Sequence, residues 1–218
     1  MDDRKGWKVV NNNMKKPKRV TPKNVVVVDD NDLHTQNTNT IPTTTTPNTP
    51  DTLNQDCGDK LFLPNNYVLW CHDIYNKDWS LAGYTKLCTV KTVADFWKLF
   101  NNLDKLGYKI NNFFLMKEGT DPIWEHENNR GGGVCSFRTD MDSSLKMYED
   151  LCSRMICNLL ANNMDDINGI SFGPKNNWAI IKIWNKDKVN DLSKTLAAHI
   201  LDTYKDASIK YKENEPEF

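Results

Sequence analysis

A tryptophan and a glutamate stand side by side, at Trp124 and Glu125, in a stretch that fits neither helix nor strand patterns. The stretch begins with Asp121-Pro122, a pair that favours turns, and ends with the glycines of 131–133, which cannot pack a core. An indole ring on a loop can stack on the face of a flat ligand, and a neighbouring carboxylate can accept hydrogen bonds from that ligand's edge. Both residues are therefore candidate ligand-binding residues. The alternative is a half-buried loop tryptophan beside a solvated acid.

The other tryptophans divide by the elements that carry them. Trp79 precedes a predicted strand and so also lies on a loop. Trp184 ends a predicted strand, and Lys182 shares its side of the sheet because alternate strand residues face the same way. Trp97 follows Phe96 on a predicted helix, where two adjacent residues cannot both face the core, so Trp97 is a candidate partner-docking residue. Two further tryptophans are expected in the core or on a sheet face: Trp70 and Trp178.

Charge and cysteine usage exclude several classes of protein. The net charge of −1 argues against a protein that coats long nucleic acid, which needs a broad basic face, but it does not exclude a pocket for one nucleotide end. The six cysteines form no Cys-x-x-Cys pair, which indicates reduced thiols rather than a disulfide framework or a zinc site. No apolar run is long enough for a signal peptide or a membrane span.

Composition divides the chain near residue 60. A mean hydropathy of −0.66 is polar for 218 residues, and the Asn-, Thr- and Pro-rich residues 1–60 are expected to form a disordered tail. Within it, Lys15 to Arg19 is a basic cluster that resembles a nuclear-import signal. Residues 61–218 are expected to form the folded domain.

The apolar pattern of the folded domain predicts strand pairs that alternate with single helices. Helices are predicted over 92–106, 144–160 and 188–204. Strands are predicted over 67–70, 84–90, 112–117, 134–138, 167–172, 178–184 and 208–212. Hairpin-like pairs imply an antiparallel sheet, and helices with one apolar stripe each can all cover one of its faces. The fold class is therefore α+β, with the other face open at its loops.

Six runs of residues in the folded domain together resemble one family. They are Tyr67-Val68-Leu69-Trp70, Thr92-Val93-Ala94-Asp95-Phe96-Trp97, Asp121-Pro122-Ile123-Trp124-Glu125, Arg130-Gly131-Gly132, Asp166-Ile167-Asn168-Gly169 and Ile183-Trp184-Asn185-Lys186. Their order and separations resemble the messenger-RNA cap-binding translation initiation factors of the 4E family, over about residues 64 to 212. The resemblance implies a curved antiparallel sheet backed by three helices on its convex face, with the cap pocket on the concave side.

The resemblance also implies a role for each candidate residue. Trp79 and Trp124 would stack on the two faces of 7-methylguanine, Glu125 would accept hydrogen bonds from its edge, and Trp184 would contact the methyl group. Cap phosphates would be held by basic residues: Lys175, Lys182, Arg130 and Arg138. The two arginines are included because Gly133-Val134 stands where the family usually has Arg-Trp. Tyr84 is a weaker substitute for Trp79. An enzyme that acts on caps, such as a decapping hydrolase, is a further alternative. No acidic motif is arranged for a metal and no nucleophile is paired with a base, so we expect no enzyme activity, cofactor or metal.

A second surface resembles the family's partner site. Val93 and Trp97 match the positions that bind an amphipathic helix of a scaffold or repressor protein, and Leu63-Pro64 partly matches an adjoining element. The expected protein is a monomer that recruits capped messenger RNA for translation through a scaffold. The alternative is a cap-binding repressor. The expected location is the cytoplasm, with the nucleus as an alternative because of the basic cluster.

Overall fold

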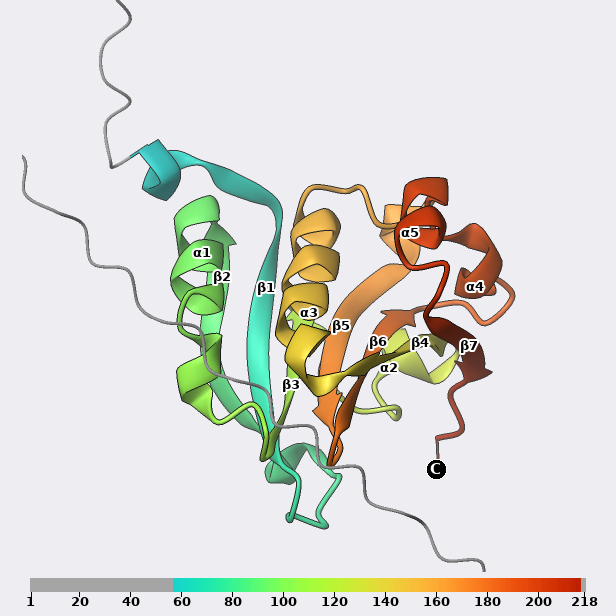
Figure 1. The fold of residues 1–218 in the computed structure, drawn as a ribbon, viewed down its shortest axis with the longest axis horizontal. Coiled ribbons are helices and arrows are strands. Elements are labelled where there is room, and N and C mark those ends of the chain that lie inside the picture. The colour runs from blue at the N-terminus through green and yellow to red at the C-terminus, as the bar shows by residue number, and fades with distance from the viewer. Residues whose placement is uncertain (1–56, 217–218) are drawn as a thin grey trace, which may run out of the picture. The chain divides into compact units, whose positions relative to one another are not determined.

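A seven-stranded antiparallel sheet organises the chain in the computed structural model, which describes residues 57–216 (Figure 1). The predicted tail and basic cluster, up to residue 56, lie outside the described residues. In spatial order the strands run β2, β1, β3, β5, β6, β4, β7. Their bounds are β1 Phe62–Asp73, β2 Thr85–Thr92, β3 Asn111–Lys117, β4 Gly133–Asp140, β5 Ile167–Pro174, β6 Trp178–Asn185 and β7 Ser208–Glu213. In this part of the chain, no helix combines the length and the apolar character that crossing a membrane requires.

The helices cover one face of the curved sheet (Figure 1). They are α1 Val93–Phe100, α3 Met141–Ile156, α4 Leu192–Thr195 and α5 Ala198–Thr203, and a one-turn helix, α2 Glu127–Arg130, lies elsewhere, in the loop before β4. Alternate strand residues such as Phe113, Leu115 and Ile181 join helix residues such as Phe96 and Tyr148 in one buried core. The predicted α+β class, with an antiparallel sheet and helices on one face, is confirmed.

Strand pairing differs from the prediction at the Trp124 loop. The strands on either side of that loop, β3 and β4, are not neighbours, because β5 and β6 lie between them. The hairpin of β5 and β6 is present as predicted, and it is this hairpin that fills the gap. The loop therefore crosses the end of the sheet instead of closing a hairpin.

Two predicted helices are shorter than their apolar patterns. The first ends at Phe100 because the Asn102 side chain donates to the Lys98 carbonyl, 2.8 Å away, in competition with the helix ladder. The third is divided into α4 and α5 at Leu196, whose backbone is extended and bridges to Ala161. The bridge between Leu196 and Ala161 thus interrupts the helix that the apolar pattern predicts.

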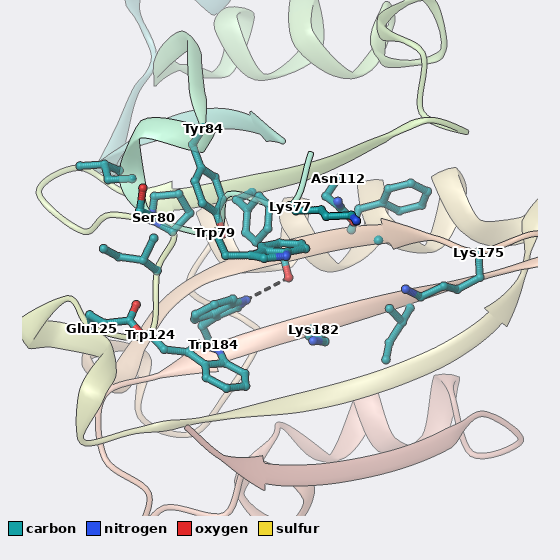
Figure 2. A pocket seen from close by; sticks show the side chains of 18 residues that line it. Lys77, Trp79, Ser80, Tyr84, Asn112, Trp124, Glu125, Lys175, Lys182 and Trp184 are labelled. Atoms are coloured by element: carbon teal, nitrogen blue, oxygen red, sulfur yellow. Dashed lines mark hydrogen bonds between the residues drawn. The ribbon is translucent and has the colours of Figure 1, made fainter. Parts of the chain in front are cut away.

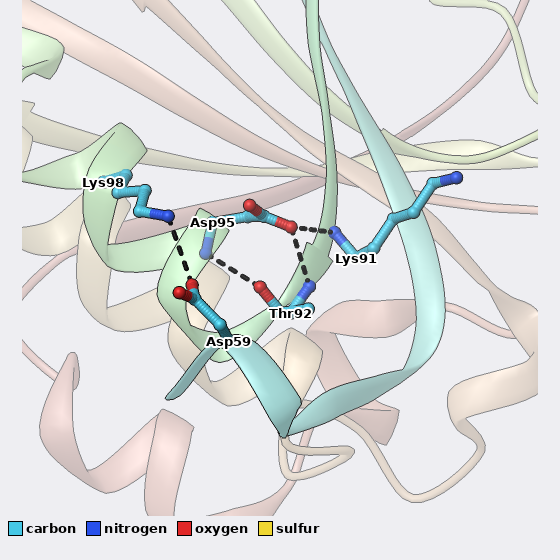
Figure 3. Close-up of polar contacts among 5 residues, drawn as sticks. All are labelled: Asp59, Lys91, Thr92, Asp95 and Lys98. Atoms are coloured by element: carbon cyan, nitrogen blue, oxygen red, sulfur yellow. Dashed lines mark hydrogen bonds and ion pairs between the residues drawn. The ribbon is translucent and has the colours of Figure 1, made fainter. Parts of the chain in front are cut away.

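Helix α1 begins with a reciprocal capping box (Figure 3). The Asp95 amide donates to Thr92 Oγ1 at 3.1 Å, and Asp95 Oδ2 accepts from the amides of Thr92 at 3.0 Å and Lys91 at 3.1 Å. Burial disfavours the charge of Asp95, but these hydrogen bonds and the charge of Lys98 outweigh it, so the pKa of this carboxyl lies below its ordinary value. The exposed Lys98–Asp59 pair at 3.2 Å adds little stability.

We expect Asp95→Asn to lower the free energy of unfolding at neutral pH by about 0.5–1 kcal/mol, because the charge at the helix start is lost. A carboxyl whose pKa is lowered by folding contributes fully above its unfolded pKa of about 3.9, and the contribution fades as pH falls through the folded pKa. The difference from wild type should therefore shrink in acid, as measured by urea unfolding at several pH values. Asp104→Asn, at an exposed acid of the 3₁₀ helix Leu103–Leu106, is the control. A pH-independent difference would contradict this account.

Candidate functional site

A cavity of about 650 Å³ opens on the sheet face opposite the helices (Figure 2). Its residues come from the loop before β2, the Trp124 loop, strands β3, β5 and β6, and the turn between β5 and β6. They are Lys77, Trp79, Ser80, Leu81, Tyr84, Asn112, Phe114, Pro122, Ile123, Trp124, Glu125, Ser171, Phe172, Gly173, Lys175, Ile180, Lys182 and Trp184. In Figure 2 the tryptophans and Glu125 gather toward one end, and Lys175 lies toward the other.

The floor of the cavity is a small apolar cluster on the sheet. Phe114 and Trp184 line the cavity, and Met116 and Val134 pack with them in the same buried cluster, because each of the four alternates with residues that face the helix-side core. Trp184 is 4% exposed, and its Nε1–H donates to Ser171 Oγ at 2.9 Å. This hydrogen bond fixes the indole, so Trp184 is a rigid wall of the site rather than a mobile clamp.

Trp79 is the exposed ring of the site, with 54% of its surface accessible. One face stacks on the His72 ring, with centroids 4.1 Å apart and an interplanar angle of 13°. His72 is itself buried, and its Nε2 lies 2.9 Å from the Asp78 carbonyl oxygen. The Tyr84 and Trp79 rings meet edge to face, with centroids 6.3 Å apart. The stacking position therefore belongs to Trp79 and not to Tyr84. The loop before β2 thus holds the Trp79 indole with one face stacked on His72, and a flat ligand can stack on the other face.

Trp124 and Glu125 approach the same cavity from the loop between β3 and α2, and both are half-buried. The Lys212 ammonium lies 5.8 Å from the centroid of the Trp124 ring. Burial, and then the negative charge of Glu125, raise the pKa of the Tyr84 hydroxyl well above its ordinary value. Glu125 therefore acts electrostatically on the cavity wall that carries Trp79.

Buried asparagines hold the Trp124 loop to the sheet. Asn129 Nδ2 donates to the carbonyls of Asp121 and Ile123, both at 2.8 Å, which bracket the turn before Trp124. Asn168 Nδ2, from β5, donates to Asn129 Oδ1 at 2.8 Å. Asn214 Nδ2, just past β7, donates to the Asn129 carbonyl at 2.7 Å. Asn129 and Asn168 are fully buried, so the loop has a polar core of its own.

A second buried amide anchors the strand that leaves the loop. Asn185 Oδ1 accepts from the Gly133 amide and from the Tyr211 hydroxyl, both at 3.0 Å. Gly133 has no room for a side chain, because a Cβ there would collide with the Tyr211 ring and lie 2.7 Å from the Lys212 carbonyl oxygen. The glycine is therefore required by the close approach of β7.

The basic residues of the site lie around strand β6 and the loops. Burial, and then the charges of Lys175 and Lys212, lower the pKa of Lys182, so these ammonium groups act on one another. Lys77 and Lys175 are exposed at the cavity wall. Together these cations attract an anion at that end of the cavity.

Two predicted phosphate-binding residues do not line the cavity. Arg130 is an exposed residue at the end of α2. Arg138 stacks over Trp178, with the guanidinium 4.3 Å from the ring centroid. Sequence reasoning missed Lys77, His72 and Lys212. Strand alternation could have placed Lys212 on the cavity side of the sheet. No local sequence signal could have shown that its strand, β7, lies beside the Trp124 loop.

The chemistry of the site is recognition of a flat, charged ligand. Rings can stack on its faces, one carboxylate can accept from its edge, and lysines can hold its anionic end. Among residues 57–216 there is no cluster of three or more His, Cys, Asp or Glu side chains that could hold a metal ion.

The residues of the second predicted surface lie on α1 and at the start of β1. The Val93 amide donates to the Leu61 carbonyl at 2.9 Å, which brings the start of β1 beside α1. Trp97 is 43% exposed there, and Phe62 is 77% exposed. Leu63 is half-buried and Pro64 exposed in the same stretch of β1. An exposed apolar patch of this kind is typical of a protein interface.

Comparison with known proteins places the chain among translation factors. The family model described as "Eukaryotic initiation factor 4E" matches residues 62–218. Eukaryotic translation initiation factor 4E of Dictyostelium discoideum is 30% identical over 131 residues, 57% of this chain and 52% of that protein. Factor 4E-1A of Danio rerio is 26% identical over 154 residues, 66% of this chain and 68% of that protein. A homolog from Acanthamoeba polyphaga mimivirus is 25% identical over 133 residues, 50% of this chain and 49% of that protein. The matches thus span about half of the Dictyostelium and mimivirus relatives.

Solved structures share the fold. The complex of C. elegans eIF4E-3 with the 4E-binding protein Mextli and cap analog has a TM-score of 0.61 at 21% identity, and it covers 72% of this chain and 98% of that chain. Ascaris suum eIF4E-3 with m7G cap has a TM-score of 0.58 at 22% identity, and it covers 72% of this chain and 93% of that chain.

We expect Asn129→Ala to lower the free energy of unfolding by about 1–3 kcal/mol, because it leaves buried amide and carbonyl groups without partners. Amide hydrogen exchange should accelerate in residues 121–130 more than in the sheet. Asn177→Ala, at an exposed position between β5 and β6, is the matched control and should change neither measurement. Unchanged exchange in the Trp124 loop of the Asn129 variant would show that the amide does not hold it.

Proposed function

Because the chain belongs to the eukaryotic initiation factor 4E family, we propose that it binds the 7-methylguanosine cap of messenger RNA and recruits that RNA for translation initiation. The observation that carries this proposal is the meeting of two loop tryptophans, a loop glutamate and three lysines around one cavity. We assign the cap-binding domain to residues 61–218. This role belongs in the cytoplasm, requires no enzymatic step and needs a single copy of the chain.

The methylated base lies between Trp79 and Trp124. Methylation makes the ring cationic, so each stacking contact of roughly 1–3 kcal/mol is supplemented by a cation–π contribution of about 1–2 kcal/mol in a desolvated site. Glu125 accepts the hydrogen bonds of the guanine N1–H and N2–H groups, and its charge strengthens them. Trp184 forms the wall against the methyl group, where its hydrogen bond to Ser171 keeps it in place.

The triphosphate lies toward Lys175 and Lys182. Their mutual repulsion, together with the burial of Lys182, disfavours the empty site, and an anion between them relieves it. Lys77 lies on the same cavity and supplies a further cation. Arg130 and Arg138 lie outside the cavity lining, so this assignment does not use them.

The patch of Val93, Trp97, Leu63 and Pro64 binds an amphipathic helix of a scaffold protein. Its exposed ring and aliphatic neighbours suit the apolar stripe of such a helix. Two related structures are complexes with the 4E-binding protein Mextli, one of them also with cap analog. A repressor function is the alternative, because α3 carries half-buried Glu149 and Ser153 near positions where the resemblance to the family leads us to expect leucines on the partner surface. Such polar residues weaken an apolar interface.

Retention on 7-methylguanosine-triphosphate resin tests the pocket. We expect wild type to be retained and GTP to compete at least about 5-fold less well than 7-methyl-GTP, because the cation–π contribution is absent. Trp124→Ala should weaken binding by roughly 30- to 5,000-fold, the equivalent of one lost stack together with its cation–π contribution. Glu125→Gln should weaken it roughly 5-fold, because a charged acceptor becomes neutral. Trp97→Ala, on the opposite face, is the matched tryptophan control and should bind as wild type does. Equal binding of GTP and 7-methyl-GTP would overturn the proposal.

The partner surface is tested with Trp97→Ala and Trp124→Ala. Their expected effects on partner binding are the reverse of their expected effects on cap binding. With Mextli as the probe, Trp97→Ala should lose at least about 30-fold in affinity, as expected for a tryptophan at the centre of an interface, and Trp124→Ala should bind normally. Addition to a translation extract depleted of its own cap-binding factor separates the two functions. A recruiter restores translation of capped RNA, and a repressor does not. Loss of Mextli binding in both variants would indicate misfolding rather than two sites.

A further inference from the structure

The sheet face that carries the cavity continues past β6 onto β4 and β7. On β7, Ile209 and Tyr211 pack against the helix-side core, so Lys210 and Lys212 project from the cavity face. On β4, Cys135 and Phe137 are in that core, so Ser136 projects with the lysines. Arg138 has the same strand parity and is exposed.

The register aligns these residues into a strip. Ser136 is paired with Lys182 on one side and with Lys210 on the other, so the three lie in one row across β6, β4 and β7. Two strand spacings give the row a length of about 10 Å. One end of the row is Lys182, which already lines the cavity. We call Lys182, Ser136, Lys210, Arg138 and Trp178 the basic strip.

The cations of the strip form none of the ion pairs found in the described residues. Among the ion pairs of residues 57–216, none includes Lys175, Lys182 or Lys210. The nearby Lys212 pairs with Glu215 at 3.1 Å, but both side chains are more than half exposed, so the pair is weak. A chain whose net charge is −1 therefore gathers unpaired positive charge on this face.

The strip also has a stacking platform. The Arg138 guanidinium lies over the Trp178 ring at 4.3 Å. Trp178 is half-buried, and Arg138 is exposed. Unstacked RNA bases bind to aromatic rings and to guanidinium planes of this kind.

We propose that the basic strip binds the first nucleotides of the messenger RNA that follow the cap. This inference rests on the proposed function. Lys182 lines the cavity (Figure 2) and is also the first residue of the strip, so a cap phosphate bound at Lys182 would bring the RNA chain to the start of the strip. Lys182 and Lys210 contact successive phosphates, Ser136 donates a hydrogen bond between them, and a base stacks on the exposed face of Arg138. The ligand is single-stranded RNA, because phosphates at intervals beside a stacking plane fit its backbone and bases.

The test compares 7-methyl-GTP with a capped RNA octamer by fluorescence titration on the full chain. We expect wild type to bind the octamer about 10-fold more tightly, and the double variant Lys210→Ala with Arg138→Ala to lose most of that gain while it binds 7-methyl-GTP within about twofold of wild type. The salt slope of octamer binding should fall by about 0.7, for the one phosphate contact of Lys210, which is roughly 2.6-fold in affinity between about 50 and about 200 mM salt. The matched control is Lys105→Ala with Lys109→Ala, two exposed lysines outside the cavity face.

The outcomes distinguish a failure of the strip proposal from a failure of the proposed cap-binding function. If wild type binds 7-methyl-GTP but gains nothing from the octamer, or if the double variant keeps the full gain and salt slope, the strip is not an RNA site and the cap pocket stands. If wild type does not bind 7-methyl-GTP, the proposed function fails and the strip proposal fails with it. An equal loss in the control variant would show a general charge effect and would also overturn the strip.

Discussion

The alternation of side chains across one antiparallel sheet is the constraint on which the rest of this structure depends. Each strand gives every second residue to a buried core beneath the helices, and the remaining residues are free to form a different surface. Phe114 belongs to the cavity floor because Phe113 and Leu115 belong to the core. Lys182 belongs to the cavity wall because Ile181 and Ile183 are buried. One apolar pattern thus fixes both the stability of the fold and the composition of its binding face.

Two loops complete the binding site that the sheet begins, and they are held in different ways. The Trp124 loop contains little that could be buried in a core, so its position is set by the Asn129 amide and by partners from β5 and the chain after β7. The Trp79 loop instead uses a ring stack on His72. Buried amides tolerate little displacement, because each lost hydrogen bond leaves a desolvated group. The two stacking residues are therefore held by different means, and Trp79 is the more exposed of the two.

Sequence patterns predicted the elements better than their partners. All seven strands occur where they were predicted, because alternation and β-branched residues are local signals. The break at Leu196 was not predictable, because it depends on a bridge to Ala161. Nor was the insertion of β5 and β6 between β3 and β4. The tryptophans and Glu125 were found from residue type and from family resemblance. The asparagine network was missed, because its bond from Asn214 to Asn129 joins residues 85 positions apart.

The glycine at the start of β4 has a consequence for the strand beside it. A Cβ at Gly133 would collide with the Tyr211 ring and approach the backbone of β7 too closely, so β7 would have to move before any other residue could stand there. The same strand brings the Lys212 ammonium to 5.8 Å from the centroid of the Trp124 ring. One steric contact thus governs both the lack of a side chain at residue 133 and the placement of a cation beside the binding face.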